Sequence, residues 1–321
     1  MDRLEIPHED VAMQKQHARI MYEAVAAYIG KAEKPFTYDE ICDEMEARFQ
    51  FLDPDAVIEF IELSLKLNPH IVKVENAPED PLFTPANVFY KGASFCLALF
   101  DEGVEGGSFF PGFMFQPYIS EELTGTEASI RPEDCEIEIG RKTARISFSE
   151  LSLSCYNDSF GMSLVKNAKE LFTAERPNDD INADIYDVEV YDLKEYFEKV
   201  SFSEGDVLVF TVEDYFGGKL KFHRLAKEER HRDIDKCVEW SLKYFEALKR
   251  VADKDGFGTG LYVQLQDVFL DNPGLLANPL FSLQEVMIFS EELIFVENHD
   301  DLPAIWRKGK PLPKDKSPDG K

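Results

Sequence analysis

The chain has 321 residues, of which 44% are hydrophobic and 30% are charged, and its formal net charge at pH 7 is −27. This composition is typical of globular domains and not of disordered chains, and the length is sufficient for two or three domains. No apolar run approaches the roughly 18 residues that a membrane span needs. The first residues also lack the basic and then apolar pattern of a secretory signal. These features predict a soluble cytoplasmic protein with no membrane partner.

The acidity extends along the whole chain. Residues 1–90 carry a net charge of −10, residues 91–225 carry −13 and residues 226–321 carry −4. Affinity for nucleic acid depends on basic side chains that displace the counterions of the phosphates, and no third of the chain has an excess of them. The five cysteines are far apart and include no C-x-x-C pair, so they indicate neither a disulfide framework nor a zinc site.

The first ninety residues contain clear signals for the starts of helices. A first helix is expected over residues 14–29, with Gly30 as its stop. Thr37 and Glu40 have the spacing of a capping box, which predicts that a second helix starts directly after Thr37. Asp53 is followed by proline, a combination that is typical of an N-cap and the first turn of a third helix.

The third helix is expected to end near Leu67, because the next two residues are Asn and Pro. Strands are then predicted at residues 71–74 and 82–84, with a loop over residues 76–81 between them. Three helices followed by a hairpin is the order of a winged helix. The stretch resembles the winged-helix families, among them the type found at the start of the delta subunit of bacterial RNA polymerase. This resemblance implies a module that contacts DNA or protein, and it covers residues 1–90 only.

The third helix is the element that reads the major groove in helix-turn-helix proteins. Its predicted polar stripe consists of Asp55, Glu59, Glu62 and Lys66, so three of the four side chains are acidic. The wing loop adds Glu79 and Asp80 and no basic residue. These carboxylates would repel a phosphate backbone at short range. We therefore expect weak or absent binding to duplex DNA, and the stripe is either a solvated acidic face or a surface for a basic protein partner.

Residues 91–225 have the pattern of short strands. Alternating segments at residues 136–139 and 143–148 flank Gly-Arg-Lys and predict a hairpin. Residues 207–212 form a continuous apolar run, which is typical of a strand that is buried on both faces. Residues 219–223 alternate again, and residues 162–174 predict an inserted helix. An antiparallel sheet or a partly open barrel is the expected assembly.

The last third of the chain predicts helices. A long amphipathic helix is expected over residues 226–253, and Ser282 with Glu285 forms a second capping box. Apolar or small residues recur at helical spacing along the long helix: Ile234, Val238, Ser241, Phe245, Leu248 and Ala252. Residues 307–321 are rich in Lys and Pro and predict a disordered tail.

These elements predict an α+β fold in four parts. Residues 1–90 form the winged-helix-like domain and residues 91–225 form a central antiparallel β-rich domain. Residues 226–306 form a helical region that packs on the β-rich domain, and residues 307–321 form the tail.

The segment over residues 109–118 is densely aromatic and contains Phe109, Phe110 and Phe113. Aromatic residues and Met are enriched at the cores of protein interfaces, so the segment is a candidate docking loop. A turn at Pro-Gly that leads into a core strand is the more common role of such a run.

Three patterns resemble catalytic or ligand-binding motifs. Ser163 and Lys166 match S-x-x-K, but the companion motifs of the penicillin-binding enzymes are missing. The glycine-rich residues 256–260 match neither a P-loop nor a dinucleotide fingerprint. His223 and His231 lie near two aspartates, Asp233 and Asp235, yet three arginines accompany them and disfavour a metal cation. We therefore predict no catalytic residue, no cofactor and no metal site.

The sequence favours a non-enzymatic interaction or regulatory protein that binds a partner with a basic surface. The residues predicted to contact this partner are Asp55, Glu59, Glu62, Lys66, Phe109, Phe110 and Phe113. The first alternative is a DNA-binding or transcription-associated regulator that uses the same winged helix. The second alternative is an enzyme or ligand-binding protein with its site in the β-rich domain.

Overall fold

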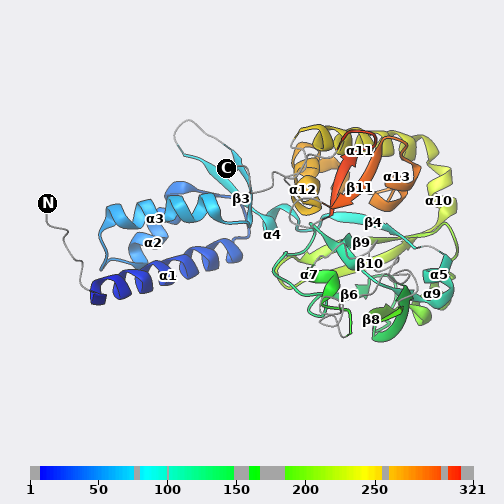
Figure 1. Cartoon of the computed structure of the whole chain (residues 1–321), viewed down its shortest axis with the longest axis horizontal. Coiled ribbons are helices and arrows are strands. Elements are labelled where there is room, and N and C mark those ends of the chain that lie inside the picture. The colour runs from blue at the N-terminus through cyan, green and yellow to red at the C-terminus, as the bar shows by residue number, and fades with distance from the viewer. Residues whose placement is uncertain are drawn as a thin grey trace, which may run out of the picture. The chain divides into compact units, whose positions relative to one another are not determined.

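The protein has an α+β fold. The structure is a computed structural model, and it describes residues 8–75, 80–99, 101–147, 159–166, 185–254, 260–297 and 303–311. The chain divides into two compact units, with the division after Lys91 (Figure 1). Among the described residues, no helix combines the length and the hydropathy needed to cross a membrane.

The first unit has the predicted order of three helices followed by a hairpin. A short strand, β1, precedes α2 and completes a three-stranded antiparallel sheet of order β1-β3-β2. The elements are α1 (His8–Lys31), β1 (Phe36–Thr37), α2 (Tyr38–Arg48), α3 (Pro54–Leu67), β2 (Ile71–Glu75), β3 (Leu82–Pro85) and α4 (Ala86–Phe89).

Both N-caps that were predicted in this unit are confirmed. The hydroxyl of Thr37 accepts a hydrogen bond from the amide of Glu40, and the Glu40 carboxylate accepts one from the amide of Thr37. The Asp53 carboxylate accepts a hydrogen bond from the amide of Asp55 at 3.0 Å. The first helix is longer than predicted, because it starts at His8 and continues through Gly30 to Lys31. Ile29 is fully buried, and its packing outweighs the low helix propensity of the glycine that follows.

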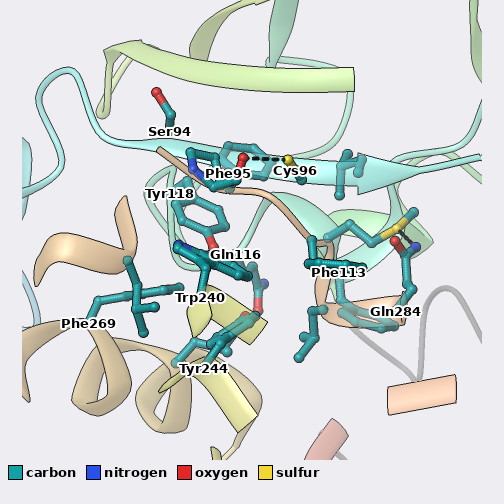
Figure 2. Close-up of a pocket in the computed structure, with 17 residues that line it drawn as sticks. Ser94, Phe95, Cys96, Phe113, Gln116, Tyr118, Trp240, Tyr244, Phe269 and Gln284 are labelled. Atoms are coloured by element: carbon teal, nitrogen blue, oxygen red, sulfur yellow. Dashed lines mark hydrogen bonds between the residues drawn. The ribbon is translucent and has the colours of Figure 1, made fainter. Parts of the chain in front are cut away.

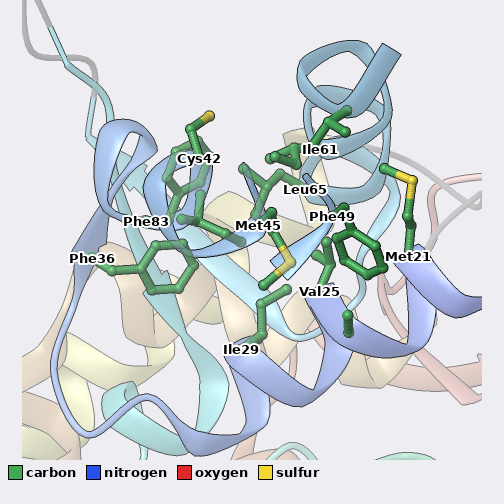
Figure 3. Packing of buried hydrophobic residues seen from close by; sticks show 13 residues of the cluster. Met21, Val25, Ile29, Phe36, Cys42, Met45, Phe49, Ile61, Leu65 and Phe83 are labelled. Atoms are coloured by element: carbon green, nitrogen blue, oxygen red, sulfur yellow. The ribbon is translucent and has the colours of Figure 1, made fainter. Parts of the chain in front are cut away.

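The core of the first unit lies where the three helices meet the sheet. Figure 3 shows side chains of α1 packing against those of α2 and α3, with Phe36 and Phe83 of the sheet at one side. The central buried residues are Met21, Val25, Ile29, Ile41, Met45, Phe49, Val57, Ile61 and Leu65. The apolar faces of the predicted helices therefore point into one common core.

The second unit contains a four-stranded sheet of order β4-β9-β10-β6. As the continuous apolar run predicted, β9 is an inner strand, and its first four residues are buried. An antiparallel sheet was predicted, but this sheet is mixed, because β6 and β10 pair in parallel. The strands are β4 (Ser94–Ala98), β6 (Ser129–Pro132), β9 (Val207–Asp214) and β10 (Lys219–Leu225).

A second sheet has the order β5-β8-β7. Its pairing shows that the hairpin predicted from residues 136–139 and 143–148 is wrong. Its strands are β5 (Ser108–Phe109), β7 (Arg141–Ser147) and β8 (Ile185–Asp192). Residues 136–139 form no strand, and β7 pairs instead with the distant β8. The Arg141 guanidinium stabilises this pairing: it lies 4.5 Å from the centre of the Tyr191 ring and donates to the Glu189 carboxylate at 3.0 Å.

Helices of the second unit flank the four-stranded sheet, with α11, α12 and α13 gathered on one side of it (Figure 1). The predicted long helix is broken at Asp233 into α10 (Lys227–Arg232) and α11 (Ile234–Lys254). The other helices are α5 (Asp101–Gly106), η1 (Gly112–Phe115), α7 (Ser159–Met162), α9 (Lys194–Val200), α12 (Leu261–Asp271), η4 (Pro273–Leu276) and α13 (Leu283–Phe289).

Two further predictions for this unit need correction. The inserted helix was expected to start at Met162, but α7 ends there, and residues 167–174 lie outside the described residues. The last third of the chain was expected to be helical, yet it contains an antiparallel hairpin of β11 (Leu293–Glu297) and β12 (Pro303–Arg307). Arg307, the first residue of the predicted tail, is held in this hairpin by ion pairs of 2.7 Å to Asp253 and Glu292.

Asp206 is a buried carboxylate that joins the turn before β9 to the start of α10. It accepts hydrogen bonds from the amide of Ser203 at 2.7 Å, from the amide of Lys227 at 2.9 Å and from the Arg224 guanidinium at 2.8 Å. Burial alone would raise the pKa of Asp206, but these donors together outweigh it and lower the pKa below the ordinary value. Asp206 is therefore a charged group that stabilises the fold at neutral pH.

We expect Thr37→Ala to lower the free energy of unfolding of the first unit by about 0.5–2 kcal/mol, because the amide of Glu40 loses its side-chain acceptor. Urea denaturation followed by circular dichroism measures this change. Thr37→Ser is the matched control, since it keeps the hydroxyl. An equal loss of stability in both variants would contradict a capping role.

We expect Asp206→Asn to be destabilising at neutral pH, with an effect that shrinks in acid. The folded-state pKa of Asp206 is lowered, so its contribution is fully present above the unfolded pKa of about 3.9 and is lost as the pH falls through the folded value. Urea denaturation of the variant and the wild type at neutral pH and below about pH 4 tests this linkage. A stability difference that is independent of pH would show that the charge of Asp206 is not what matters.

Candidate interaction surface

α11 carries apolar side chains on two faces. The buried face packs toward α12 and β12 and consists of Cys237, Tyr244, Ala247, Leu248, Val251 and Ala252. The second face starts at the N-terminal end of the helix with Ile234, Val238 and Leu242, which are 49%, 49% and 56% exposed. Residues four apart lie above one another on a helix, so these three form a continuous stripe. The first half of the apolar pattern that was predicted for this helix is therefore not covered by the described part of the chain.

α13 provides a second apolar wall beside Leu242. Its last residue, Phe289, is 77% exposed, which is the largest exposed fraction among the big hydrophobic residues described. A groove of 380 Å³ runs between the two helices. Its lining includes Leu242 and Phe245 from α11, Val286 and Phe289 from α13, and Glu291 from the turn that follows.

Two local interactions fix the position of α13. The predicted capping box is confirmed, because Ser282 accepts a hydrogen bond from the amide of Glu285 and donates its own amide to the Glu285 carboxylate. Arg230 of α10 forms an ion pair of 2.7 Å with the same carboxylate and lies 4.6 Å from the centre of the Phe281 ring. The helix α13, which carries Phe289, is thus held in place by its contact with α10 as well as by its own N-cap.

The charged side chains that line the groove are two carboxylates, and one of them is already paired, because Glu292 forms an ion pair of 2.7 Å with Arg307. The lining contains Glu291 and Glu292 and no Lys or Arg. The nearby lysines already have acidic partners: Lys243 pairs with Glu239 at 2.6 Å, and Lys249 pairs with Glu246 at 2.9 Å. Each of these ion pairs is neutral in sum, so Glu291, which makes no ion pair with another described residue, leaves the edge of the groove acidic.

The acidic stripe predicted on α3 lies on the surface of the first unit. Asp55, Glu59, Glu62 and Lys66 are all exposed. Glu62 accepts a hydrogen bond from the Tyr38 hydroxyl at 3.3 Å. An exposed leucine, Leu63, lies within the same stretch, and periodicity does not single it out, because the helix has a complete apolar face without it.

One of the two predicted acids of the wing also has a structural contact. Asp80 accepts a hydrogen bond from the amide of Tyr38 at 2.9 Å, so it serves the start of α2. Glu79, the other predicted acid of the wing, lies outside the described residues.

The aromatic segment is part of the core, and this corrects the prediction that it contacts a partner. Phe109 and Phe113 are 2% and 3% exposed. The Phe109 ring lies 5.7 Å from the Phe115 ring and 6.0 Å from the Phe210 ring, measured between centres. Phe110 is half-buried and packs against a small cluster around Val188. Burying these large rings together stabilises the unit more than exposing them would.

A small cavity lies between β4 and the helices that flank it (Figure 2). Its volume is 30 Å³, whereas pockets for small-molecule ligands measure about 300–1,000 Å³. Trp240 Nε1 and Gln284 Oε1 are buried beside it and have no hydrogen-bond partner among the described residues. A space of this size accommodates ordered water, which would satisfy such polar atoms. It is too small for a substrate.

Cys96 lines the same cavity but is not an activated nucleophile. Its thiol is fully buried and donates a hydrogen bond to the carbonyl of Pro279 at 3.2 Å. Burial raises the pKa of Cys96 above its ordinary value, so the thiol stays protonated at neutral pH.

Ser163 and Lys166 do not act as a pair. The Ser163 hydroxyl donates to the carbonyl of Phe160 at 2.7 Å and accepts from the amide of Gly125 at 2.6 Å. Lys166 donates to the Thr143 hydroxyl instead. The serine therefore stabilises the turn after α7, and among the described residues its oxygen is hydrogen-bonded to two backbone groups and to no base.

The two histidines that were weighed as metal ligands have different surroundings. His223 Nδ1 lies 2.6 Å from a Glu133 oxygen, and Lys221 pairs with the same carboxylate at 2.7 Å. The hydrogen bond from Lys221 is the main reason that the pKa of Glu133 is lowered. His231 is exposed on α10. In the part of the chain that the structure describes, no three His, Cys, Asp or Glu side chains are grouped to hold a metal ion.

The glycine-rich segment is described only at its end. Gly260 is the N-cap of α12, and residues 256–259 lie outside the described residues.

Comparison of the chain with protein-family models, with curated proteins and with solved structures gives no match.

Proposed function

We propose that this is a non-enzymatic interaction protein that binds a protein partner through the groove between α11 and α13. The observation that carries the proposal is the exposed apolar surface at this groove, formed by Leu242 and Phe289 and continued by the stripe from Ile234 to Val238. Contiguous exposed apolar surface next to polar residues is typical of protein interaction sites. Aromatic side chains that project from such a site are the ones that most often dominate binding energy.

The negative charge of the chain supports a role for the surface outside the groove, which is to attract a positively charged partner during the encounter. A net charge of −27 accelerates encounters with positively charged partners and repels nucleic acid. Exposed ion pairs alone contribute about 0–1 kcal/mol each, so a stable complex also needs apolar anchors. The groove supplies these anchors, whereas the aromatic segment over residues 109–118 is committed to the core.

The first unit is proposed to be a winged-helix module that also serves protein contacts. Its three helices and three-stranded sheet are consistent with this proposal, and the exposed carboxylates of α3 disfavour contact with phosphates.

We expect Leu242→Ser and Phe289→Ser to abolish the retention of a partner when the full chain is immobilised and exposed to a cell extract. Both side chains are exposed, so the variants should fold as the wild type does. The matched controls are Ile185→Ser, at a residue 56% exposed like Leu242, and Phe51→Ser, at a residue 69% exposed. The proteins retained are compared by mass spectrometry at low and high salt.

Proteins that are retained by the wild type and both controls, and lost from both groove variants, would support the proposal. If the wild type, the two groove variants and the two controls all retain the same proteins equally, the interaction lies outside the groove. If no protein is retained by the wild type at either salt concentration, the interaction function itself is wrong.

A further inference from the structure

We propose that the occupant of the groove between α11 and α13 is an amphipathic helix of a partner protein, with a polar face rich in Lys and Arg. This inference rests on the proposed function and names the chemistry of the partner. It follows from three features: the shape of the apolar surface, the kind of elements that build it, and the charges at its edge.

The shape fits a helix. The exposed stripe on α11 runs from Ile234 to Leu242, which is about 12 Å along the helix axis at 1.5 Å per residue. Phe289 and Val286 on α13 extend the apolar surface sideways from Leu242. An exposed apolar stripe that leads into a groove matches the apolar face of a helix, whose anchors recur every three or four residues.

The elements that build the groove disfavour an extended peptide. A strand binds mainly by main-chain hydrogen bonds to the open edge of a sheet. Here the walls are two helices, whose backbone groups are bonded within each helix, and the lining residues end at Glu292, before β11 begins. The groove offers side chains for packing and no strand edge for pairing.

The charges at the edge favour a basic partner. Glu291 is exposed beside Phe289 and makes no ion pair with another described residue, whereas Asp235, exposed at the start of the stripe, has the exposed Arg232 three residues before it. Lys and Arg on the polar face of a bound helix would meet these carboxylates. A Glu-rich helix would be repelled by them, and like charges at an interface disfavour association.

The same charges disfavour two other occupants. A second copy of the chain would bring the same patch against itself, as twofold symmetry requires, so that Asp235 and Glu291 would face acidic edges. The first unit is no better suited, because residues 1–90 carry a net charge of −10.

The test uses the full chain and three fluorescein-labelled synthetic helices. One has Leu at helical spacing with Lys on its polar face, the second has Glu in place of every Lys, and the third has the composition of the first in a scrambled order. Fluorescence anisotropy at low and high salt measures their affinities. We expect the Lys helix to bind about tenfold more tightly than either of the others, and its affinity to fall as salt rises.

Variants of the protein locate the binding. We expect Leu242→Ser and Phe289→Ser each to weaken binding of the Lys helix by about tenfold or more, as is typical for the loss of a central apolar anchor. Glu291→Lys should weaken binding at low salt and have less effect at high salt. The matched controls are Phe51→Ser and Glu105→Lys, at exposed residues that do not line the groove, and both should bind as the wild type does.

Equal affinity for the Lys and Glu helices would overturn the inference, as would binding that is insensitive to the groove variants. A dimer that sedimentation detects in the wild type and that Leu242→Ser dissociates would also overturn it, by assigning the groove to a second copy. If the groove variants lose a partner from extract but the Lys helix does not bind, only the chemistry proposed for the occupant is wrong. If the Lys helix binds at the groove but no protein is retained from extract, the proposed function fails and the groove chemistry stands.

Discussion

The second unit depends on the way in which α11 divides its apolar side chains between two faces. The face with Tyr244, Leu248 and Val251 is buried and joins the helix to α12 and the hairpin of β11 and β12. The face with Ile234, Val238 and Leu242 is exposed. Apolar area in contact with water is unfavourable by about 25 cal/mol per Å², and this cost is the reason that we propose a partner for the exposed stripe.

The acidity of the chain and the apolar groove have different roles in this account. The charge acts at a distance, where it selects basic partners and speeds their approach, and salt weakens it. The groove acts only on contact, and it supplies the burial on which a lasting complex depends. Neither feature suffices alone, because surface charges contribute little to affinity and an apolar groove by itself has little selectivity.

The parts of the fold that the sequence predicted well are those that depend on neighbouring residues. The capping boxes at Thr37 and Ser282 and the cap at Asp53 involve groups within three residues of each other, and all three are present. The buried strand β9 was also evident, because its composition alone indicates burial on both faces.

The predictions that were wrong concern elements whose partners are distant in the sequence. β7 was paired with the segment before it, but its partner is β8, and the contact of Arg141 with Tyr191 that joins them spans 50 residues. The hairpin of β11 and β12 was missed because its residues up to 306 were assigned to a helical region, and the ion pair of Arg307 with Asp253, which holds its end, joins residues 54 apart in the sequence. The groove was missed for a related reason. Periodicity shows that Val238 lies on an apolar face of a helix, but only packing shows whether that face is covered.

In the proposed complex, Phe289 lies in the interface with the partner. Site-specific photo-crosslinking tests this directly, with p-benzoylphenylalanine placed in the full chain at position 289 and, in a separate protein, at position 63 on the acidic face of α3. Both positions are exposed, so the probe should be tolerated at each. We expect a covalent adduct with a partner helix rich in Lys and Arg from position 289, whether or not position 63 also crosslinks. An adduct from position 63 alone would contradict this expectation and would assign the interaction to the first unit.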